Sequence, residues 1–155
     1  MAALCILQGG TMKLIIAEKP SVALSIAKVV GASSRKDGYA QGNGYMVSWC
    51  VGHLIQMASP DKYDEKYAKW NLNDLPILPK EFKYEVSKNT KKQYGVLKKL
   101  LHLKEVDTVI NACDAGREGE LIFRLVYEEA TCKKPIKRLW ISSMEDESIR
   151  KGIES

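Results

Sequence analysis

Short apolar runs alternate with amphipathic segments along the chain, and two of the runs end at a carboxylate. Residues 14–17 are apolar and stop at Glu18, and an apolar, β-branched run that begins at residue 106 stops at Asp114. A helical pattern follows each run at once, which is typical of strands buried on both faces of a parallel sheet. The pattern therefore predicts an α/β fold with a central, mostly parallel sheet flanked by helices.

The remaining segments extend this scheme. Pro20 and Ser21 are expected to open the first helix, with Ser21 as its cap and Gly31 as its left-handed end. The same rules predict a hairpin at residues 39–43 and 45–51, strands at 82–87 and 137–141, helices at 91–103 and 145–153, and a loop with at most one helical turn at 59–79.

Acidic residues at strand ends are the first candidates for chemistry. Ligands of open parallel sheets gather outside the carboxyl ends of the strands, and neighbouring strands lie about 4.8 Å apart. If the two strands are neighbours, Glu18, Asp114 and Glu118 converge, and such crowding favours a shared Mg²⁺ ion or a retained proton. The plainer alternative is that Asp114 caps the following helix, while Glu118 and Glu120 favour the positive end of that helix.

Four motifs carry a family resemblance. They are IIAEKPSVA, WCVGHL, YDEKYAKWNLNDLPILP and REGELIFR, which begin at residues 15, 49, 63 and 117. An acid after the first strand and a later D-x-x-R-E-G-E turn resemble the Toprim domain shared by topoisomerases, primases and some nucleases. The four motifs together resemble the bacterial topoisomerase III branch of the type IA topoisomerases. The resemblance covers residues 12–155 and implies a Rossmann-like Toprim fold, so residues 1–11 are expected to be an upstream extension or a cloning remnant.

The resemblance implies an enzyme that cleaves one DNA strand, passes another strand through the gap and reseals the first. A tyrosine attacks the phosphodiester, and the 5′-phosphotyrosine intermediate preserves the bond energy, so no high-energy cofactor is needed. Glu18 matches the general acid that protonates the leaving 3′ oxygen, and crowding by Asp114 favours its protonated form. Lys19 matches a lysine that steadies the scissile phosphate. The implied cofactor is Mg²⁺, held by Glu18, Asp114 and Glu118.

The implied partner is DNA in single-stranded segments, and four residues are candidates for contact with it. His53, in the GHL motif, is expected either to face DNA or to lie in the core. Lys69 and Trp70 pair a cation with an aromatic ring, which suits a phosphate and a base face, although Trp70 could equally fill the core. Arg117 is expected either to contact phosphate or to neutralise the acidic cluster.

One position departs from the family pattern. Many members carry D-x-D before R-E, whereas this chain has Asp114-Ala115-Gly116. A second metal aspartate is therefore missing. Because Mg²⁺ keeps several waters and needs only one or two carboxylates, we expect its binding to be weakened rather than lost.

Length limits what the chain can be. Its 155 residues make one domain, whereas type IA topoisomerases are several times longer and carry the nucleophilic tyrosine in a later domain. We therefore expect residues 12–155 to be the Toprim part of such an enzyme. This part is expected to be inactive in cleavage by itself and to work with further domains beyond Ser155.

Composition adds three smaller points. The four cysteines lack C-x-x-C spacing, which argues against a zinc site and favours reduced thiols in the cytoplasm, where the resemblance places the protein near the nucleoid. No apolar run approaches the ~20 residues of a membrane span, so no membrane partner is expected. The net charge of +5 is concentrated in the lysines of residues 80–104, which favour a solvated helix face over a DNA-binding patch.

Three other functions share parts of this pattern. A Toprim nuclease or primase would carry the acids but lack the KWNLNDLPILP segment. A non-catalytic Toprim scaffold, which binds DNA or proteins, would not need Glu18, Asp114 and Glu118 together. A receiver-like phosphoacceptor domain would carry an acidic pair after its first strand, where this chain has Glu18-Lys19. The topoisomerase prediction is the one that accounts for all four motifs.

Overall fold

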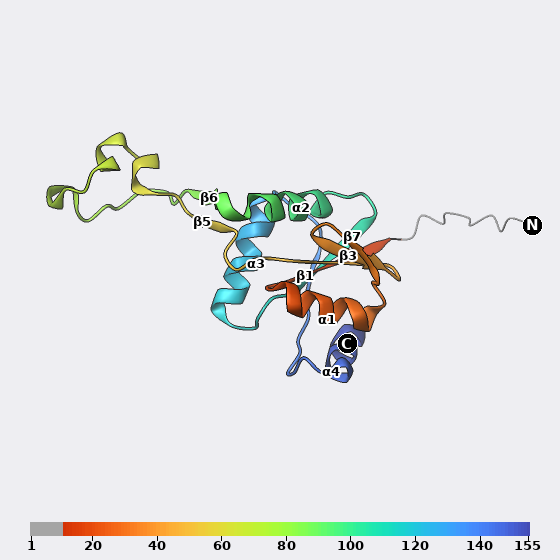
Figure 1. Ribbon diagram of the computed structural model, residues 1–155. Coiled ribbons are helices and arrows are strands. Elements are labelled where there is room, and N and C mark those ends of the chain that lie inside the picture. Colours follow the sequence, from red (N-terminus) through yellow and green to blue (C-terminus); the bar gives the residue numbers. More distant parts are fainter. Residues whose placement is uncertain (1–10) are drawn as a thin grey trace, which may run out of the picture.

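A six-stranded sheet forms the centre of the computed structural model, which describes residues 11–155 (Figure 1). The strand order is β2-β3-β4-β1-β7-β8. The strands are β1 (Met12–Ala17), β2 (Ser34–Lys36), β3 (Tyr39–Gly42), β4 (Tyr45–Trp49), β7 (Val106–Ala112) and β8 (Ile136–Arg138). The predicted α/β fold is confirmed, and so is the predicted hairpin, which consists of β3 and β4.

The three central strands end level with one another. β1 lies between β4 and β7 and pairs with both in parallel, so that Ala17 lies opposite Trp49 on one side and Ala112 on the other. β8 continues the parallel part beyond β7, whereas β2 and β3 form an antiparallel edge. The two acid-bearing strands are therefore neighbours, as predicted, and Glu18 and Asp114 follow them at the same edge of the sheet.

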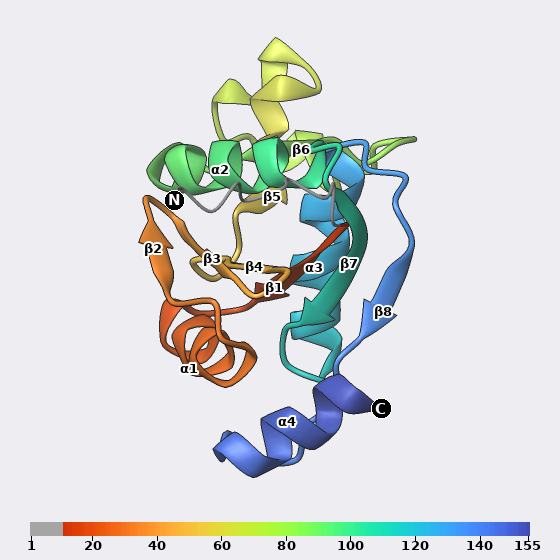
Figure 2. The same cartoon turned by 90° about the vertical axis from the view of Figure 1, so that its right-hand side faces the viewer.

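Helices cover both faces of the sheet (Figure 2). One face carries α1 (Pro20–Val30) and α4 (Asp146–Glu154), and the other carries α2 (Lys91–Leu101) and α3 (Arg117–Glu129). Side chains of β1 alternate between these layers: Leu14 and Ile16 pack with α2 and α3, and Ile15 and Ala17 pack with α1 and α4. All four side chains are fully buried, which explains why β1 is a continuous apolar run.

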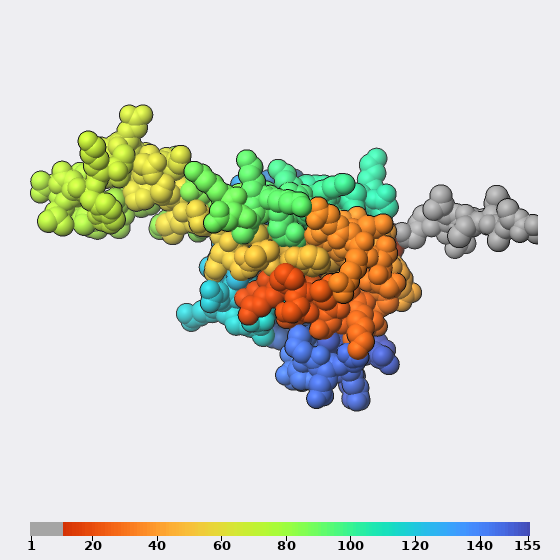
Figure 3. Space-filling view, viewed as in Figure 1, coloured from red at the N-terminus to blue at the C-terminus, as the bar shows by residue number. Residues whose placement is uncertain are grey.

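A long arm projects from the domain between β5 (Ile55–Met57) and β6 (Tyr84–Val86), which pair as a separate antiparallel sheet. The arm (residues 58–83, yellow to green) stands away from the central sheet in Figure 1 and from the body of the domain in Figure 3. Its short 3₁₀ helices are η1 (Pro60–Lys62), η2 (Glu65–Ala68) and η3 (Leu72–Asp74), and η4 (Lys88–Thr90) precedes α2. The prediction of at most one turn was wrong, because Asp64 and Asn71 each accept a backbone N–H two residues on and so start a turn.

Two helix starts differ from those predicted. α1 begins at Pro20 with Lys19 as its N-cap, so Ser21 is not the cap. Proline suits the first helical position because the N–H it lacks would have no partner there. α3 begins at Arg117, with Gly116 as its N-cap and no capping side chain. Asp114 therefore does not cap α3, and the alternative that explained it as a cap is wrong.

The ends of the chain and its helices bear on two further predictions. The extension predicted at residues 1–11 lies outside the described residues, apart from Thr11. Among the helices of residues 11–155, none combines the length and the apolar character needed to span a membrane.

Candidate catalytic and metal-binding site

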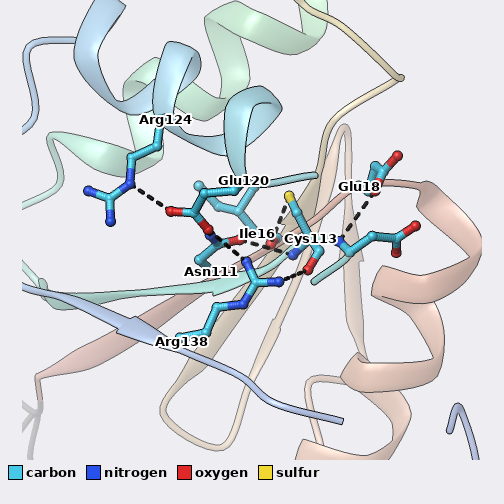
Figure 4. Close-up of polar contacts among 8 residues, drawn as sticks. Ile16, Glu18, Asn111, Cys113, Glu120, Arg124 and Arg138 are labelled. Carbon is cyan, nitrogen blue, oxygen red and sulfur yellow. Dashed lines mark hydrogen bonds and ion pairs between the residues drawn. The ribbon is translucent and has the colours of Figure 1, made fainter. Parts of the chain in front are cut away.

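Glu18 and Asp114 meet at the carboxyl edge of the sheet. Glu18 directly follows β1, and Asp114 lies in the short turn between β7 and α3. The backbone N–H of Asp114 donates a hydrogen bond to Oε2 of Glu18 over 3.3 Å (Figure 4). Glu18 is half-buried and Asp114 is exposed. Two carboxylates from neighbouring strands therefore share one solvent-accessible edge, as the sequence predicts.

Glu118 is held by a different partner. Its Oε1 lies 3.0 Å from Nε2 of His53, which belongs to the loop between β4 and β5. The His53 side chain is 41% exposed, so it is not a core histidine. Within residues 11–155, no three His, Cys, Asp or Glu side chains gather closely enough to hold a metal ion. The expected convergence of all three acids is therefore not met, because the first turn of α3 carries Glu118 toward His53.

Glu18 and Asp114 by themselves fit the needs of Mg²⁺. This ion takes oxygen ligands, commonly uses one or two carboxylates and keeps several waters. Asp114 also lines a hollow of about 210 Å³, bordered by Val22 of α1 and by Leu139 beyond β8, which leaves room for such waters.

Two basic residues lie close to the acidic pair in the sequence, Lys19 directly after Glu18 and Arg117 three residues after Asp114. Lys19 is the N-cap of α1 and is exposed, so its backbone is fixed while its ammonium group stays accessible. Arg117 is exposed at the start of α3 and lines a groove of about 480 Å³ together with Arg124, Arg138 and Trp140. Both residues can therefore meet an anionic ligand without displacing a buried group.

Lys69 and Trp70 are not brought to the acidic pair. They lie in the arm, which projects from the body of the domain (Figure 3). Trp70 is 90% exposed, so the alternative that it fills the core is wrong. Both residues line a hollow of about 210 Å³ with Tyr67 and Leu75. The arm contains as many lysines as acidic residues, so any attraction to DNA is local to individual side chains.

A polar network lies beneath the Asp114 turn, and its residues were missed from the sequence. Oε2 of Glu120 accepts hydrogen bonds from Nδ2 of Asn111 at 2.9 Å and from Nη1 of Arg138 at 3.1 Å (Figure 4). Its Oε1 accepts a hydrogen bond from Nε of Arg124 at 2.8 Å. The one available signal was Asn111, a polar residue inside the apolar run of β7, and its side chain is only 2% exposed.

Gly119 lets α3 approach the Asp114 turn. A Cβ atom at Gly119 would collide with the carbonyl oxygen of Asp114 and would lie 2.8 Å from its backbone nitrogen. Any larger residue would therefore push the helix and the turn apart. Gly116 differs, because a Cβ atom there meets nothing within 4 Å and its φ of −76° suits any residue.

Two thiols follow the strands on either side of β1. Cys50 follows β4 and Cys113 follows β7, and both are free and buried, as predicted. The neighbouring Cys113 thiol and, after it, burial raise the pKa of Cys50 well above its usual range. Because the thiolate is the reactive form of cysteine, Cys50 is a structural residue rather than a nucleophile.

Comparison with known proteins agrees with this geometry. A model of the Toprim domain family matches residues 13–144, a span that contains the acidic pair and the network beneath it. The chain belongs to the Toprim family. This Toprim chain is similar to DNA topoisomerase 3 of Shouchella clausii (strain KSM-K16), with 47% identity over 142 residues that cover 92% of the chain and 20% of the relative. It is also similar to DNA topoisomerase 3 of Bacillus anthracis, with 50% identity over 138 residues that cover 89% of the chain and 19% of the relative.

The resemblance to topoisomerase III is thus confirmed, and the Toprim chain spans about a fifth of the length of these curated relatives. Among solved structures it is similar to full-length topoisomerase I from Thermotoga maritima. The TM-score is 0.59 and the identity 22%, and the match covers 91% of this chain and 20% of that one. This likeness confirms the Toprim fold.

Proposed function

We propose that this chain is the Toprim part of a type IA DNA topoisomerase III, which cleaves, passes and reseals single DNA strands through a 5′-phosphotyrosine intermediate. The observation that carries the proposal is the contact between Glu18 and Asp114, which places two acids from adjacent parallel strands at one accessible edge. The names of the similar curated proteins support it. We place the protein in the cytoplasm, near the nucleoid, and the free cysteines support that location.

In this proposal, Glu18 acts as the general acid. Cleavage releases a 3′ oxygen that needs a proton, and a half-buried carboxyl at the sheet edge can deliver it. Resealing reverses the step, so the same group takes the proton back. Lys19, fixed at its backbone by α1 and free at its ammonium group, steadies the scissile phosphate beside it.

We propose that Asp114 and Glu18 hold Mg²⁺, with waters completing its shell. When bound, the ion would neutralise charge on the DNA phosphate near the site of cleavage. The hydrogen bond from the backbone N–H of Asp114 keeps Oε2 of Glu18 turned toward the Asp114 turn. Glu118 joins this pair in the DNA-bound state, after its release from His53.

We further propose that His53, Lys69, Trp70 and Arg117 contact single-stranded DNA. The nearly complete exposure of Trp70 supports a stacking role, because an aromatic ring on a projecting arm can accept any base. Lys69, next to it, supplies a charge for the backbone. His53 and Arg117 flank the acidic edge and would meet the phosphates nearest to the reaction.

A chimera tests the proposal directly. Residues 12–155 replace the matching segment of Shouchella clausii DNA topoisomerase 3, to which the chain is 47% identical. The chimera is expected to relax negatively supercoiled plasmid in the presence of Mg²⁺. Glu18→Gln should reduce the rate by roughly 10²–10⁴-fold, the usual contribution of a general acid.

The matched control is Glu128→Gln, which removes one acid from the exposed side of α3. It is expected to leave relaxation unchanged. A folded chimera whose relaxation rate is the same with Glu18→Gln would refute the role of Glu18. A chimera that nicks plasmid without resealing it would instead support a Toprim nuclease.

A further inference from the structure

The backbone of Cys113, the residue before Asp114, is held by side chains rather than by the backbone of a neighbouring strand. Regular pairing of β7 ends at Ala112. The backbone N–H of Cys113 then donates to Oδ1 of Asn111 at 3.0 Å, and its carbonyl oxygen accepts from Nη2 of Arg138 at 2.6 Å. Both polar groups of the Cys113 backbone, which leads into Asp114, are therefore hydrogen-bonded to side chains (Figure 4).

The two side chains that bind the Cys113 backbone, Asn111 and Arg138, both donate to one carboxylate oxygen. Nδ2 of Asn111 and Nη1 of Arg138 donate to Oε2 of Glu120. Asn111 is buried, so its amide has no water to replace Glu120 as an acceptor. The Arg138 side chain is 16% exposed and also packs over the ring of Trp140 at 5.2 Å, which limits its freedom to reorient. Glu120 therefore fixes which way Asn111 and Arg138 face.

One peptide unit connects the hydrogen bonds at Cys113 with the acidic pair. The carbonyl of Cys113 and the N–H of Asp114 belong to the same peptide, whose plane is rigid. Arg138 binds that carbonyl, and the N–H on the opposite side donates to Oε2 of Glu18. The orientation of this peptide is therefore set at one end by Arg138, and it presents its other end to Glu18.

We infer that Glu120 is a positioning residue, which acts through Asn111 and Arg138 to fix the peptide between Cys113 and Asp114, and hence the placement of Asp114 against Glu18. This placement would hold two carboxylates together for Mg²⁺ binding and proton transfer. That purpose, and only that purpose, rests on the proposed function. The positioning itself stands on the hydrogen bonds alone.

A merely structural role for Glu120 predicts something different. Glu120 also binds Arg124, one turn further along α3, and this pair could simply stabilise the helix. Arg124 makes no hydrogen bond to Cys113 among the described residues. Arg124→Met therefore removes an ion pair of Glu120 but leaves the hydrogen bonds to Cys113 in place. It is the matched control for Arg138→Met.

The experiment measures amide hydrogen exchange and NMR shifts in the chain itself. Glu120→Ala and Arg138→Met are expected to speed exchange of the Cys113 amide by about tenfold, roughly what one hydrogen bond to a charged group contributes. They should also shift the Asp114 amide resonance. Arg124→Met and Glu128→Gln should change neither signal. Wild-type exchange at Cys113 in Glu120→Ala, or an equal loss in Arg124→Met, would overturn the inference.

Two additions keep the outcome clear. Should Glu120→Ala fail to fold, Glu120→Gln decides, since its one carbonyl oxygen can serve Asn111 and Arg138 and should restore most of the protection at Cys113. A Mg²⁺ titration of the same variants separates the two proposals. If wild type binds no Mg²⁺ while the exchange pattern appears as expected, the metal site is wrong and the positioning stands.

Discussion

The backbone N–H of Asp114 donates to Oε2 of Glu18 over 3.3 Å, across the ends of two adjacent parallel strands. This contact joins the residue proposed to transfer a proton with the residue proposed to hold the metal. Asp114 also lines the hollow that Val22 borders. Substitutions at Asp114 and in its turn should therefore affect cation binding most directly.

The first prediction concerns Mg²⁺ affinity. Asp114→Asn removes one of two anionic ligands and should raise the dissociation constant for Mg²⁺ by about tenfold or more. Gly116→Asp should lower that constant, because the new carboxylate enters open space beside the pair. Isothermal calorimetry of the three proteins measures both effects. Thermal unfolding with and without Mg²⁺ should follow them through ligand linkage.

The metal-free proteins supply the control for this prediction. Without Mg²⁺, Gly116→Asp should be neutral or destabilising, since it adds negative charge near Glu18 and Asp114. A gain in stability that appears without Mg²⁺ would mean that the aspartate acts as a helix cap at the start of α3. Equal Mg²⁺ affinity in wild type and Asp114→Asn would remove Asp114 from the site.

The second prediction compares two helical glycines. Gly119→Ala should lower the free energy of unfolding by roughly 1–3 kcal/mol, because its Cβ would collide with the Asp114 backbone. Gly95→Ala should raise the same quantity by about 0.5–1 kcal/mol, because Gly95 lies in α2 with open space around its Cβ position. Urea unfolding measures both. Gly119→Ala with wild-type stability would mean that the turn and α3 separate at little cost.

The sequence predicted the parts of the site that depend on local pattern. Apolar runs that stop at Glu18 and Asp114 define strand ends, and parallel pairing brings such ends together. The position of Trp70 was left open by the sequence, because an aromatic residue in a loop has no periodic neighbours that would indicate its burial. Its 90% exposure follows from the projection of the arm as a whole.

Contacts between distant segments could not be predicted in this way. His53 and Glu118 are 65 residues apart, and they meet only because the loop after β4 passes the start of α3. Arg138 reaches Glu120 because β8 lies beside β7. Nothing in the spacing of these residues distinguishes Glu120, which anchors the turn, from Glu118, which binds His53. The predicted convergence of Glu18, Asp114 and Glu118 was not met for this reason.

The third prediction concerns stability at alkaline pH. Burial raises the pKa of Tyr94 and of Tyr127 above the usual value for tyrosine. Because their folded pKa values exceed the unfolded ones, the folded state holds its phenolic protons more tightly. The resulting stability is fully present below about pH 10 and is lost as pH rises through the folded pKa values. Urea unfolding from pH 8 to pH 11 should show this decline.

Single tyrosine variants isolate the effect from the titration of lysines. Tyr94→Phe should flatten the decline, since phenylalanine has no proton to lose. Tyr84→Phe is the matched control, because Tyr84 is 42% exposed in β6, and it should leave the decline unchanged. If both variants decline as steeply as wild type, burial of Tyr94 does not set the alkaline limit.

The last prediction tests whether the arm binds DNA. Trp70→Ala should weaken binding of a single-stranded oligonucleotide by about 5–150-fold, which corresponds to the 1–3 kcal/mol of one stacked base. Lys69→Ala should lower the slope of log K against log salt by about 0.7, the share of one phosphate contact. Leu78→Ala is the matched control: Leu78 lies on the same arm and is 82% exposed, but it has neither ring nor charge. Fluorescence anisotropy at several salt concentrations measures all three. A loss in Leu78→Ala equal to that in Trp70→Ala would mean that the arm offers a general apolar surface, and stacking by Trp70 would be rejected.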